Sequence, residues 1–295
     1  MITRKEKRRE FKNKNQKDKF SQNFPQAKKS LGQNFLNDEK FLNLIVETAN
    51  LKKTDNVLEV GPGTGLLTDK LERAPKKVIC IEKDRRMVKY LVAKYGLNKE
   101  KQKEQKIEII EGDILEIDLP KFLKERNFGD YKVVANIPYY ITGKLLRLLL
   151  ETEVRAKSIV LLIQKEVAER VCSESGSMNI LAVSVQYYAD IRLVAVVPRE
   201  VFSPIPKVDS AIIHATPFLK ERESVELEKG FFKVVKSGFS SPRKKLLNNL
   251  ASGLKLEKDK LTFIFSEFGW DENVRAQNLS IKQWKELRDK ISKNF

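Results

Sequence analysis

The chain has 295 residues, of which 41% are hydrophobic and 33% are charged. That length is ample for one large domain or two unequal ones with a proper core. No run approaches the roughly 18 apolar residues of a membrane span, and the basic N-terminus lacks the apolar stretch of a secretory signal. Two cysteines exclude a disulfide framework, and a single histidine excludes a multi-histidine metal site. We therefore expect a cytoplasmic protein that uses no metal.

The net charge of +17 is concentrated in two blocks. Residues 1–29 hold eleven Lys or Arg against three Asp or Glu, and residues 231–256 hold six against none. Basic blocks on either side of a more balanced middle predict a polyanionic partner. The first block also fits a solvated, disordered tail. An anionic membrane surface is less favoured, because no apolar segment precedes either block.

Residues 1–27 are rich in Lys, Asn and Gln, which predicts a disordered basic tail. From residue 28 to 218, strand and helix patterns alternate, which predicts an α/β domain built on a parallel, doubly wound sheet. Asp38 is placed to cap its first helix, over about 39–50. Almost continuously apolar runs predict strands buried on both faces, and they cover 56–60, 77–81, 107–110, 131–135 and 158–163. Helices are expected after them at 64–73, 84–95, 143–151 and 164–172.

The pattern changes near residue 220, after which no strand is convincing. Helices are predicted at 225–238, 242–253, 257–268 and 280–292. A charged linker at 218–224 separates them from the α/β part, so we expect a small helical domain over 219–295 that binds RNA. Its most basic run contains Arg243, Lys244 and Lys245, which are candidate RNA contacts.

A glycine turn follows the first predicted strand. "VLEVGPGTGLLT" places Gly61, Gly63 and Gly65 there, where the backbone can approach a ligand beside a helix N-terminus. A dinucleotide site would have its last glycine at position 66, which is Leu66 here. The spacing GxGxG is instead that of many S-adenosylmethionine enzymes, and a tight turn without a ligand is the alternative.

Three polar residues stand at the ends of the next strands. Glu82, 21 residues after Gly61, can accept hydrogen bonds from both ribose hydroxyls. Asp113 in "EGDIL" can accept from the adenine amine of the cofactor, and Asn136 ends the fourth strand. Because ligands bind at the carboxyl ends of strands in open α/β sheets, these residues predict one cofactor site.

The stretch "VVANIPYYITGKLL" explains what such a cofactor would be used for. An exocyclic adenine amine becomes nucleophilic when acceptors engage its N–H groups and favour the developing positive charge. Asn136 can supply a side-chain oxygen, and Ile137 a carbonyl that Pro138 holds outward by restricting the residue before it. Tyr139 can stack on the base. A plain strand-to-helix turn is the alternative, and Tyr140 fits either a pocket wall or packing.

Phe202, in "REVFSPIPKVDS", is a candidate for the opposite wall of the base pocket. A phenylalanine before a proline-stiffened loop can close an aromatic sandwich, and ordinary core packing is its alternative. Catalysis would then use Asn136, Ile137, Pro138, Tyr139 and Phe202, with neither a metal nor a covalent nucleophile.

Eight motifs occur in a fixed order along residues 28–290: "KKSLGQNFLND", "VLEVGPGTGLLT", "VICIEKD", "EGDIL", "NIPYYI", "LLIQKEVAERV", "SVQYYADI" and "VFSPIPKVDSAI". With them the chain resembles the small-subunit ribosomal RNA adenine N6-dimethyltransferase family. The resemblance implies a Rossmann-like class I S-adenosylmethionine methyltransferase sheet. It also implies that Asn34 and Leu36 contact the cofactor, and that Gly61, Glu82, Asp113 and Asn136 are cofactor or catalytic positions.

The family transfers methyl groups to two adjacent adenosines near the 3′ end of small-subunit rRNA, within an assembling 30S-type particle. The resemblance thus implies that reaction here, carried out by what we expect to be a monomer. Two alternatives stay open from the sequence. One is a large-subunit rRNA methyltransferase of the macrolide-resistance type. The other is an RNA-binding assembly factor whose catalysis is dispensable.

Overall fold

The structure is a computed structural model that describes residues 24–97, 104–219 and 223–294. The predicted tail, apart from residues 24–27, lies outside this part. The chain divides into two compact units. We call Met1–Lys165 with Val194–Thr216 the sheet unit, and Glu166–Leu193 with Pro217–Phe295 the helical unit.

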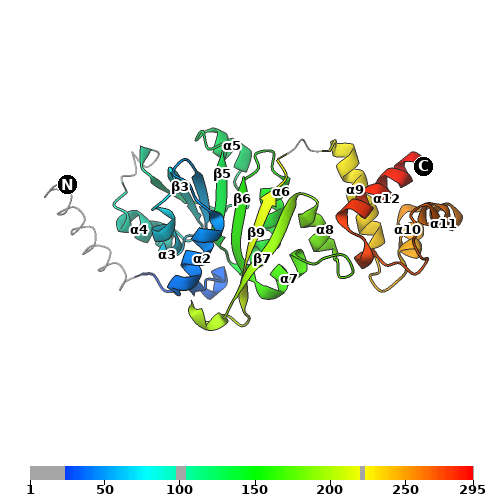
Figure 1. Ribbon diagram of the computed structural model, residues 1–295. Coiled ribbons are helices and arrows are strands. Elements are labelled where there is room, and N and C mark those ends of the chain that lie inside the picture. Colours follow the sequence, from blue (N-terminus) through cyan, green and yellow to red (C-terminus); the bar gives the residue numbers. More distant parts are fainter. Residues whose placement is uncertain (1–23, 98–103, 220–222, 295) are drawn as a thin grey trace. The chain divides into compact units, whose positions relative to one another are not determined.

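The sheet has seven strands in the order β4-β3-β2-β5-β6-β9-β7 (Figure 1). Neighbouring strands from β4 to β6 run parallel, and β9 pairs antiparallel with β6. The chain order reverses beside β2, which is where open α/β sheets bind ligands. The strands are β2 (Asn56–Val60), β3 (Lys77–Glu82), β4 (Ile107–Glu111), β5 (Tyr131–Asn136), β6 (Ser158–Gln164), β7 (Ala189–Val197) and β9 (Ser210–Pro217).

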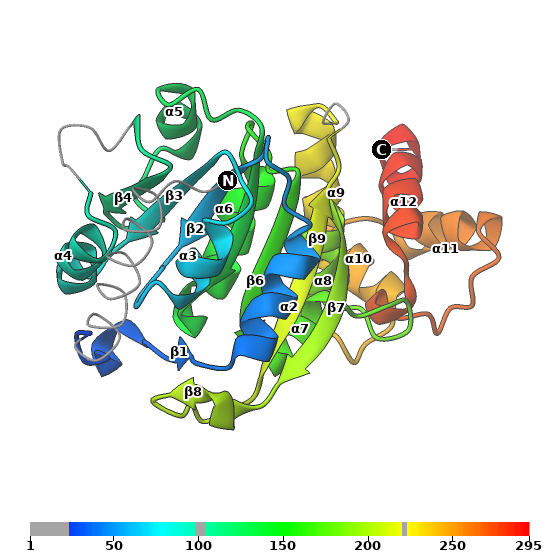
Figure 2. The same ribbon diagram turned by 60° about the vertical axis from the view of Figure 1, so that its left-hand side comes forward.

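The predicted fold class is confirmed, and the strand interiors show why. Six successive residues of β6 are buried, from Ser158 to Ile163, because layers cover both faces of the sheet. Helix α2 (Glu39–Ala49) lies across one face against β5 and β6 (Figure 2). Asp38 caps it as predicted, accepting from the backbone N–H groups of Lys40 and Phe41. The other helices before β7 are α3 (Leu66–Leu71), α4 (Arg85–Lys94), α5 (Leu119–Lys124), α6 (Thr142–Glu151), α7 (Lys165–Val171) and α8 (Ile180–Gln186).

A short antiparallel pair joins segments that are far apart in the sequence. Strand β1 (Phe35–Leu36) pairs with β8 (Phe202–Ser203), with Leu36 opposite Phe202. Asn37 extends the pair by donating its N–H to the Val201 carbonyl at 3.1 Å. The "QNFL" segment is therefore held in place by residues 201–203, which begin the proline-rich loop.

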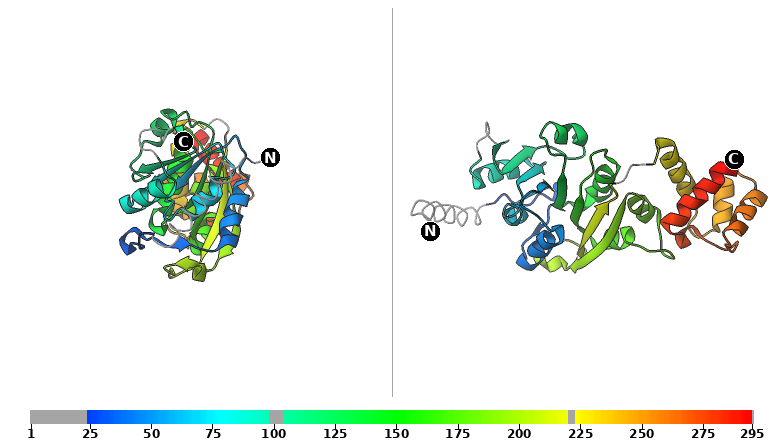
Figure 3. Two further views of the ribbon diagram at one scale, coloured as in Figure 1. Left: turned by 90° about the vertical axis from the view of Figure 1, so that its left-hand side faces the viewer. Right: turned by 45° about the horizontal axis from the view of Figure 1, so that its top comes forward.

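The helical unit contains α9 (Val225–Gly238), α10 (Leu246–Leu254), α11 (Lys258–Glu267) and α12 (Ile281–Asn294). Helix α10 packs on α9 and α11, and α12 packs on α9 (Figure 3, yellow to red). The prediction that α10 begins at residue 242 is wrong. It begins at Leu246, because the Asn249 side chain donates to the Gly238 and Ser241 carbonyls and holds residues 239–245 in a turn.

Residues 166–193 group with the C-terminal helices, although the predicted domain boundary placed them with the sheet. Tyr187 packs on Phe231 and Phe232 of α9, with ring centroids 4.3 and 5.2 Å apart. The Tyr188 carbonyl also accepts from the Phe218 N–H at 2.8 Å. This aromatic cluster, which the alternating pattern does not reveal, holds the segment in the helical unit.

Candidate active site

A pocket of about 800 Å³, counting its space open to solvent, lies at the carboxyl ends of β2, β3 and β5. It joins the predicted cofactor residues to the "NIPY" stretch. It is lined by Leu31, Gly32, Gln33, Asn34, Phe35, Leu36, Leu42, Glu59, Gly61, Pro62, Gly63, Thr64, Leu66, Leu67, Glu82, Lys83, Asn136, Ile137, Pro138, Tyr139 and Tyr140. The structure thus brings together all the predicted cofactor and catalytic residues except Asp113 and Phe202.

The glycine turn needs its glycines for two separate reasons. Gly61 and Gly63 have φ angles of 68° and 55°, in the left-handed region that side chains disfavour. A Cβ on Gly63 would also lie 2.8 Å from the ring of Phe35. From α4, Lys94 Nζ donates to the Thr64 and Gly65 carbonyls at 3.0 and 3.2 Å, which fixes the turn.

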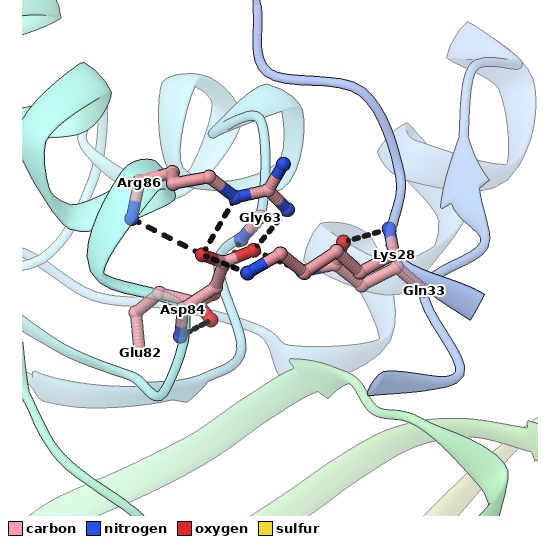
Figure 4. A network of polar contacts seen from close by, with 6 residues as sticks. All are labelled: Lys28, Gln33, Gly63, Glu82, Asp84 and Arg86. Carbon is pink, nitrogen blue, oxygen red and sulfur yellow. Dashed lines mark hydrogen bonds and ion pairs between the residues drawn. The ribbon is translucent and has the colours of Figure 1, made fainter. Parts of the chain in front are cut away.

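Glu82 is nearly buried and is held by backbone groups on both sides (Figure 4). Oε2 accepts from the Gly63 N–H at 3.1 Å, and Oε1 accepts from the Asp84 N–H at 2.8 Å. Burial raises the pKa of Glu82, although these backbone bonds oppose the rise. These two bonds fix the carboxylate. Each of its oxygens has a second lone pair, so the group can still accept from ribose hydroxyls.

Asp84 links this carboxylate to the segment before β1 (Figure 4). Its side chain accepts from Gln33 Nε2 at 3.2 Å and from Arg86 Nη2 at 2.6 Å. Gln33 in turn accepts from the Lys28 N–H at 2.7 Å, and the Lys28 ammonium lies 4.0 Å from Asp84. The Arg86 guanidinium holds the pKa of Asp84 below its usual range, so Asp84 remains an anion. The Asp84 carboxylate therefore connects the Glu82 side of the pocket to the segment that carries Asn34.

Asp113 is not among the residues that line the pocket. Its Oδ2 lies 2.7 Å from Lys83 Nζ, and its Oδ1 accepts from the Leu115 N–H at 3.0 Å. Burial raises the pKa of Asp113, but the bonds from Lys83 and Leu115 lower it by more, so the net shift is downward. Lys83, and not Asp113, lines the pocket. An adenine amine that bound the Asp113 carboxylate would have to share that carboxylate with the Lys83 ammonium.

The "NIPY" residues follow β5 directly. Asn136 Nδ2 donates to the Asn34 carbonyl at 3.4 Å, which ties the tetrad to the predicted cofactor segment. That contact uses the amide nitrogen, so it does not occupy the oxygen that the proposed chemistry requires. Pro138 has φ −59° and ψ 135°, an extended conformation that leads into a 3-10 turn over Tyr139–Ile141. Tyr140 is 59% exposed.

Phe202 lies in β8 and is only 3% exposed. It packs in the hydrophobic core with Leu36, Leu42 and Ile212, and the pocket lining does not include it. This placement supports its alternative, core packing, and its role as an aromatic wall stays a prediction.

A second hollow lies in the helical unit. Arg243, Lys244 and Lys245, in the turn before α10, line it together with Lys258 and Arg275. All five side chains are exposed, and no residue of the described part that lines the hollow is acidic. The predicted basic run is therefore part of a larger cationic surface.

Sequence reasoning missed several residues that the folded chain places at these sites. Glu59 lines the pocket and accepts from Thr68 Oγ1 at 2.6 Å, and its buried carboxyl has its pKa raised to about 7 by burial. Gln33 and Lys83 gain their contacts from long-range pairing, for which no local signal exists. Glu59, however, could have been predicted as unusual from the sequence, because it is an acid inside the apolar strand "VLEV".

Over the residues that the structure describes, no cluster of three or more His, Cys, Asp or Glu side chains is suited to hold a metal. The absence of metal from the reaction stays a prediction. Within the same ranges, no helix is long and apolar enough to span a membrane.

The parallel sheet, the glycine turn and the carboxylate at the end of β3 define a Rossmann-like methyltransferase. The family model described as "Ribosomal RNA adenine dimethylase" matches residues 24–293. The chain therefore belongs to the ribosomal RNA adenine dimethylase family.

Curated relatives agree with this membership. The chain is 39% identical to a ribosomal RNA small subunit methyltransferase A of Fusobacterium nucleatum, over 88% of this chain and 96% of the relative. It is 40% identical to the protein of the same name from Dehalococcoides mccartyi, over 88% and 87%.

Two solved structures share the fold over most of their lengths. A dimethyladenosine transferase from Plasmodium falciparum has a TM-score of 0.69 and 30% identity, covering 88% of this chain and 98% of its own. The 23S rRNA methyltransferase ErmE has a TM-score of 0.70 and 25% identity, covering 88% and 99%. Similarity of fold over most of the chain therefore does not by itself distinguish a 23S rRNA methyltransferase from a dimethyladenosine transferase.

Proposed function

We propose that this protein transfers methyl groups to N6 of two adjacent adenosines near the 3′ end of small-subunit rRNA, giving N6,N6-dimethyladenosine. The family match and the names of the curated relatives support this reaction. The observation that carries the chemistry is the position of Asn136, which links the segment of Asn34 to the "NIPY" turn in one pocket. We further propose that the protein acts in the cytoplasm as a monomer on an assembling 30S-type particle.

The residues present fit S-adenosylmethionine as the cofactor. Gly61 and Gly63 let the backbone approach a ligand, and Glu82 presents a fixed carboxylate of the kind that binds ribose hydroxyls. Asn34 and Leu36 close the same pocket from the N-terminal segment. When bound, S-adenosylmethionine supplies an electrophilic sulfonium methyl group.

The tetrad residues act on the target base. The Asn136 side-chain oxygen and the Ile137 carbonyl accept from the adenine amine and stabilise the positive charge that develops on its nitrogen. Tyr139 stacks on the base and aligns the amine. The same geometry suits both methylations of one nitrogen, since a monomethylated amine keeps one N–H to donate.

The cationic hollow around Arg243, Lys244 and Lys245 binds rRNA phosphates in this proposal. Five exposed cations with no acidic lining residue among those described form an electrostatic footprint for a polyanion. Such contacts position the RNA and do not read its bases. An assembly role that needs binding without catalysis would rest on the same surface.

Mapping the modified nucleotides tests the function. Unmethylated small subunits are incubated with the protein and S-adenosylmethionine, and the rRNA is digested and analysed by mass spectrometry. Dimethylation of two adjacent adenosines near the 3′ end is expected. Methylation of large-subunit rRNA instead would overturn the small-subunit assignment in favour of the resistance type of enzyme. Particle binding without any methyl transfer would favour the assembly-factor alternative.

A further inference from the structure

The hydroxyl of Tyr139 is hydrogen-bonded to Ser210 Oγ at 2.7 Å. Ser210 is the first residue of β9 and is fully buried, whereas Tyr139 lines the pocket. We propose that Ser210 is a positioning residue for adenine methylation, which holds the Tyr139 ring in the orientation that receives the target base. This inference rests on the proposed function, because it assigns the stacking role to Tyr139.

The backbone around Ser210 is fixed from several directions. Ser210 lies opposite Gln164 in the antiparallel pair of β9 with β6. The preceding residue, Asp209, accepts from the Lys165 N–H through its carbonyl at 3.0 Å and from the Arg199 N–H through Oδ1 at 3.1 Å. Ser210 therefore presents its hydroxyl from a fixed position at the start of β9, beside the carboxyl end of β6.

Tyr139 needs such support because its own backbone lies in a turn. The ring is carried by the 3-10 turn Tyr139–Ile141, and two side-chain torsions separate it from that turn. Burial raises the pKa of Tyr139, so the phenol stays neutral and keeps its proton. With the backbone held by the turn and the hydroxyl held by Ser210, the ring is restrained at both ends. A pre-oriented stacking surface avoids the entropy of ordering it on each encounter.

A double-mutant cycle tests the proposal. The rate constant kcat for labelled methyl transfer to unmethylated small subunits is measured for the wild type, Ser210→Ala, Tyr139→Phe and the double variant. Losing one hydrogen bond that aligns a reacting group should lower kcat about 10-fold in either single variant. The double variant should also lose about 10-fold, because both changes remove the same contact. The Kd for S-adenosylmethionine should stay within about 2-fold of wild type in all three variants. A general loss of folded protein would weaken the apparent binding as well as lower kcat, so an unchanged Kd separates the two explanations.

Two control variants make the same deletions elsewhere in this sheet. Ser158→Ala removes a hydroxyl of β6 that lies 2.9 Å from Nε2 of His214 in β9, the strand that also carries Ser210. Tyr131→Phe removes a hydroxyl that donates to the Val154 carbonyl at 2.9 Å. Both should keep wild-type kcat even where they lower Tm.

Three outcomes would overturn the inference: losses that multiply to about 100-fold in the double variant, equal losses in the controls, or no loss in Tyr139→Phe. Tyr139→Phe keeps the test decisive if Ser210→Ala fails to fold. A wild-type enzyme that methylates a different adenine would refute the proposed function. The cycle measured on that adenine would still decide the role of Ser210.

Discussion

The pocket of the sheet unit and the cationic hollow of the helical unit are built on opposite principles. Glu82, which lines the pocket, and Asp84, which lies next to it, are almost fully buried, and backbone groups or neighbouring side chains fix each of their oxygens. In the hollow, the side chains of Lys244 and Lys245 are exposed. A buried, fixed group acts through its position, so one substitution has a large effect. An exposed cation acts through charge, so its effect is shared among neighbours and screened by salt.

The largest effect is expected from Asn136→Ala. Removing one preorganised electrostatic partner typically lowers kcat by about 10² to 10³, whereas the affinity for small subunits should stay nearly unchanged. Single-turnover methylation and a binding assay measure the two quantities. Asn56→Ala is the matched control, because Asn56 begins β2 and donates to the Asp130 carbonyl away from the pocket. If Asn136→Ala also abolished binding, the division of labour between the two regions would be wrong.

Glu59 should make the sheet unit less stable as the pH rises. Its pKa is about 7 when folded, against 4.5 for an ordinary glutamic acid, because burial disfavours the charged form. Between these values the unfolded chain has lost the proton that the folded protein keeps. The free energy of unfolding should therefore fall by up to about 3 kcal/mol as the pH rises through this window.

Glu59→Gln should remove that slope, because the amide can still accept from Thr68 but does not titrate. Urea denaturation at pH 5, 6, 7 and 8 measures the free energy of unfolding of both proteins. The variant should become the more stable one at pH 8. Parallel curves for the two proteins would show that Glu59 does not titrate in this range.

Reversing two charges in the hollow should have a moderate, salt-dependent effect. Lys244→Glu with Lys245→Glu should weaken RNA binding about 10-fold at low salt and flatten the dependence of log K on log salt. Lys121→Glu with Lys124→Glu changes the net charge equally from exposed positions on α5 and should have less effect. Filter binding at several salt concentrations gives both slopes. Equal losses in the two variants would mean that overall charge, and not the hollow, attracts the RNA.

The smallest effect is expected from Gln33→Ala. This change removes the hydrogen bond from Gln33 to Asp84 that holds the segment of Asn34, which should raise the Kd for S-adenosylmethionine about 3- to 10-fold. Isothermal titration calorimetry measures the Kd. Gln186→Ala removes comparable amide contacts, to the Val171 and Ser173 carbonyls, and should leave the Kd unchanged. An unchanged Kd in Gln33→Ala would show that the network of Figure 4 is structural only.

Local patterns were sufficient to predict much of the sheet unit. Apolar runs and glycine turns are local signals that indicate where parallel strands end. They were enough to predict that the strand ends Glu82 and Asn136 would lie in one pocket. The contacts of Asp113 with Lys83 and of Tyr139 with Ser210 join residues 30 and 71 positions apart. No periodicity records such pairs, since they depend on which elements become neighbours after folding.

The contact between Phe35 and Gly63 limits which substitutions this end of the pocket can accept. A methyl group at position 63 would meet the Phe35 ring at 2.8 Å and would also require a left-handed backbone conformation, with φ 55°. A smaller residue at position 35 relieves the first conflict but not the second. A single substitution at position 63 should therefore destabilise the protein, and a compensated double change would still leave its backbone strained. Neither order of change at positions 35 and 63 therefore reaches a relaxed backbone, so this end of the pocket tolerates few alternatives.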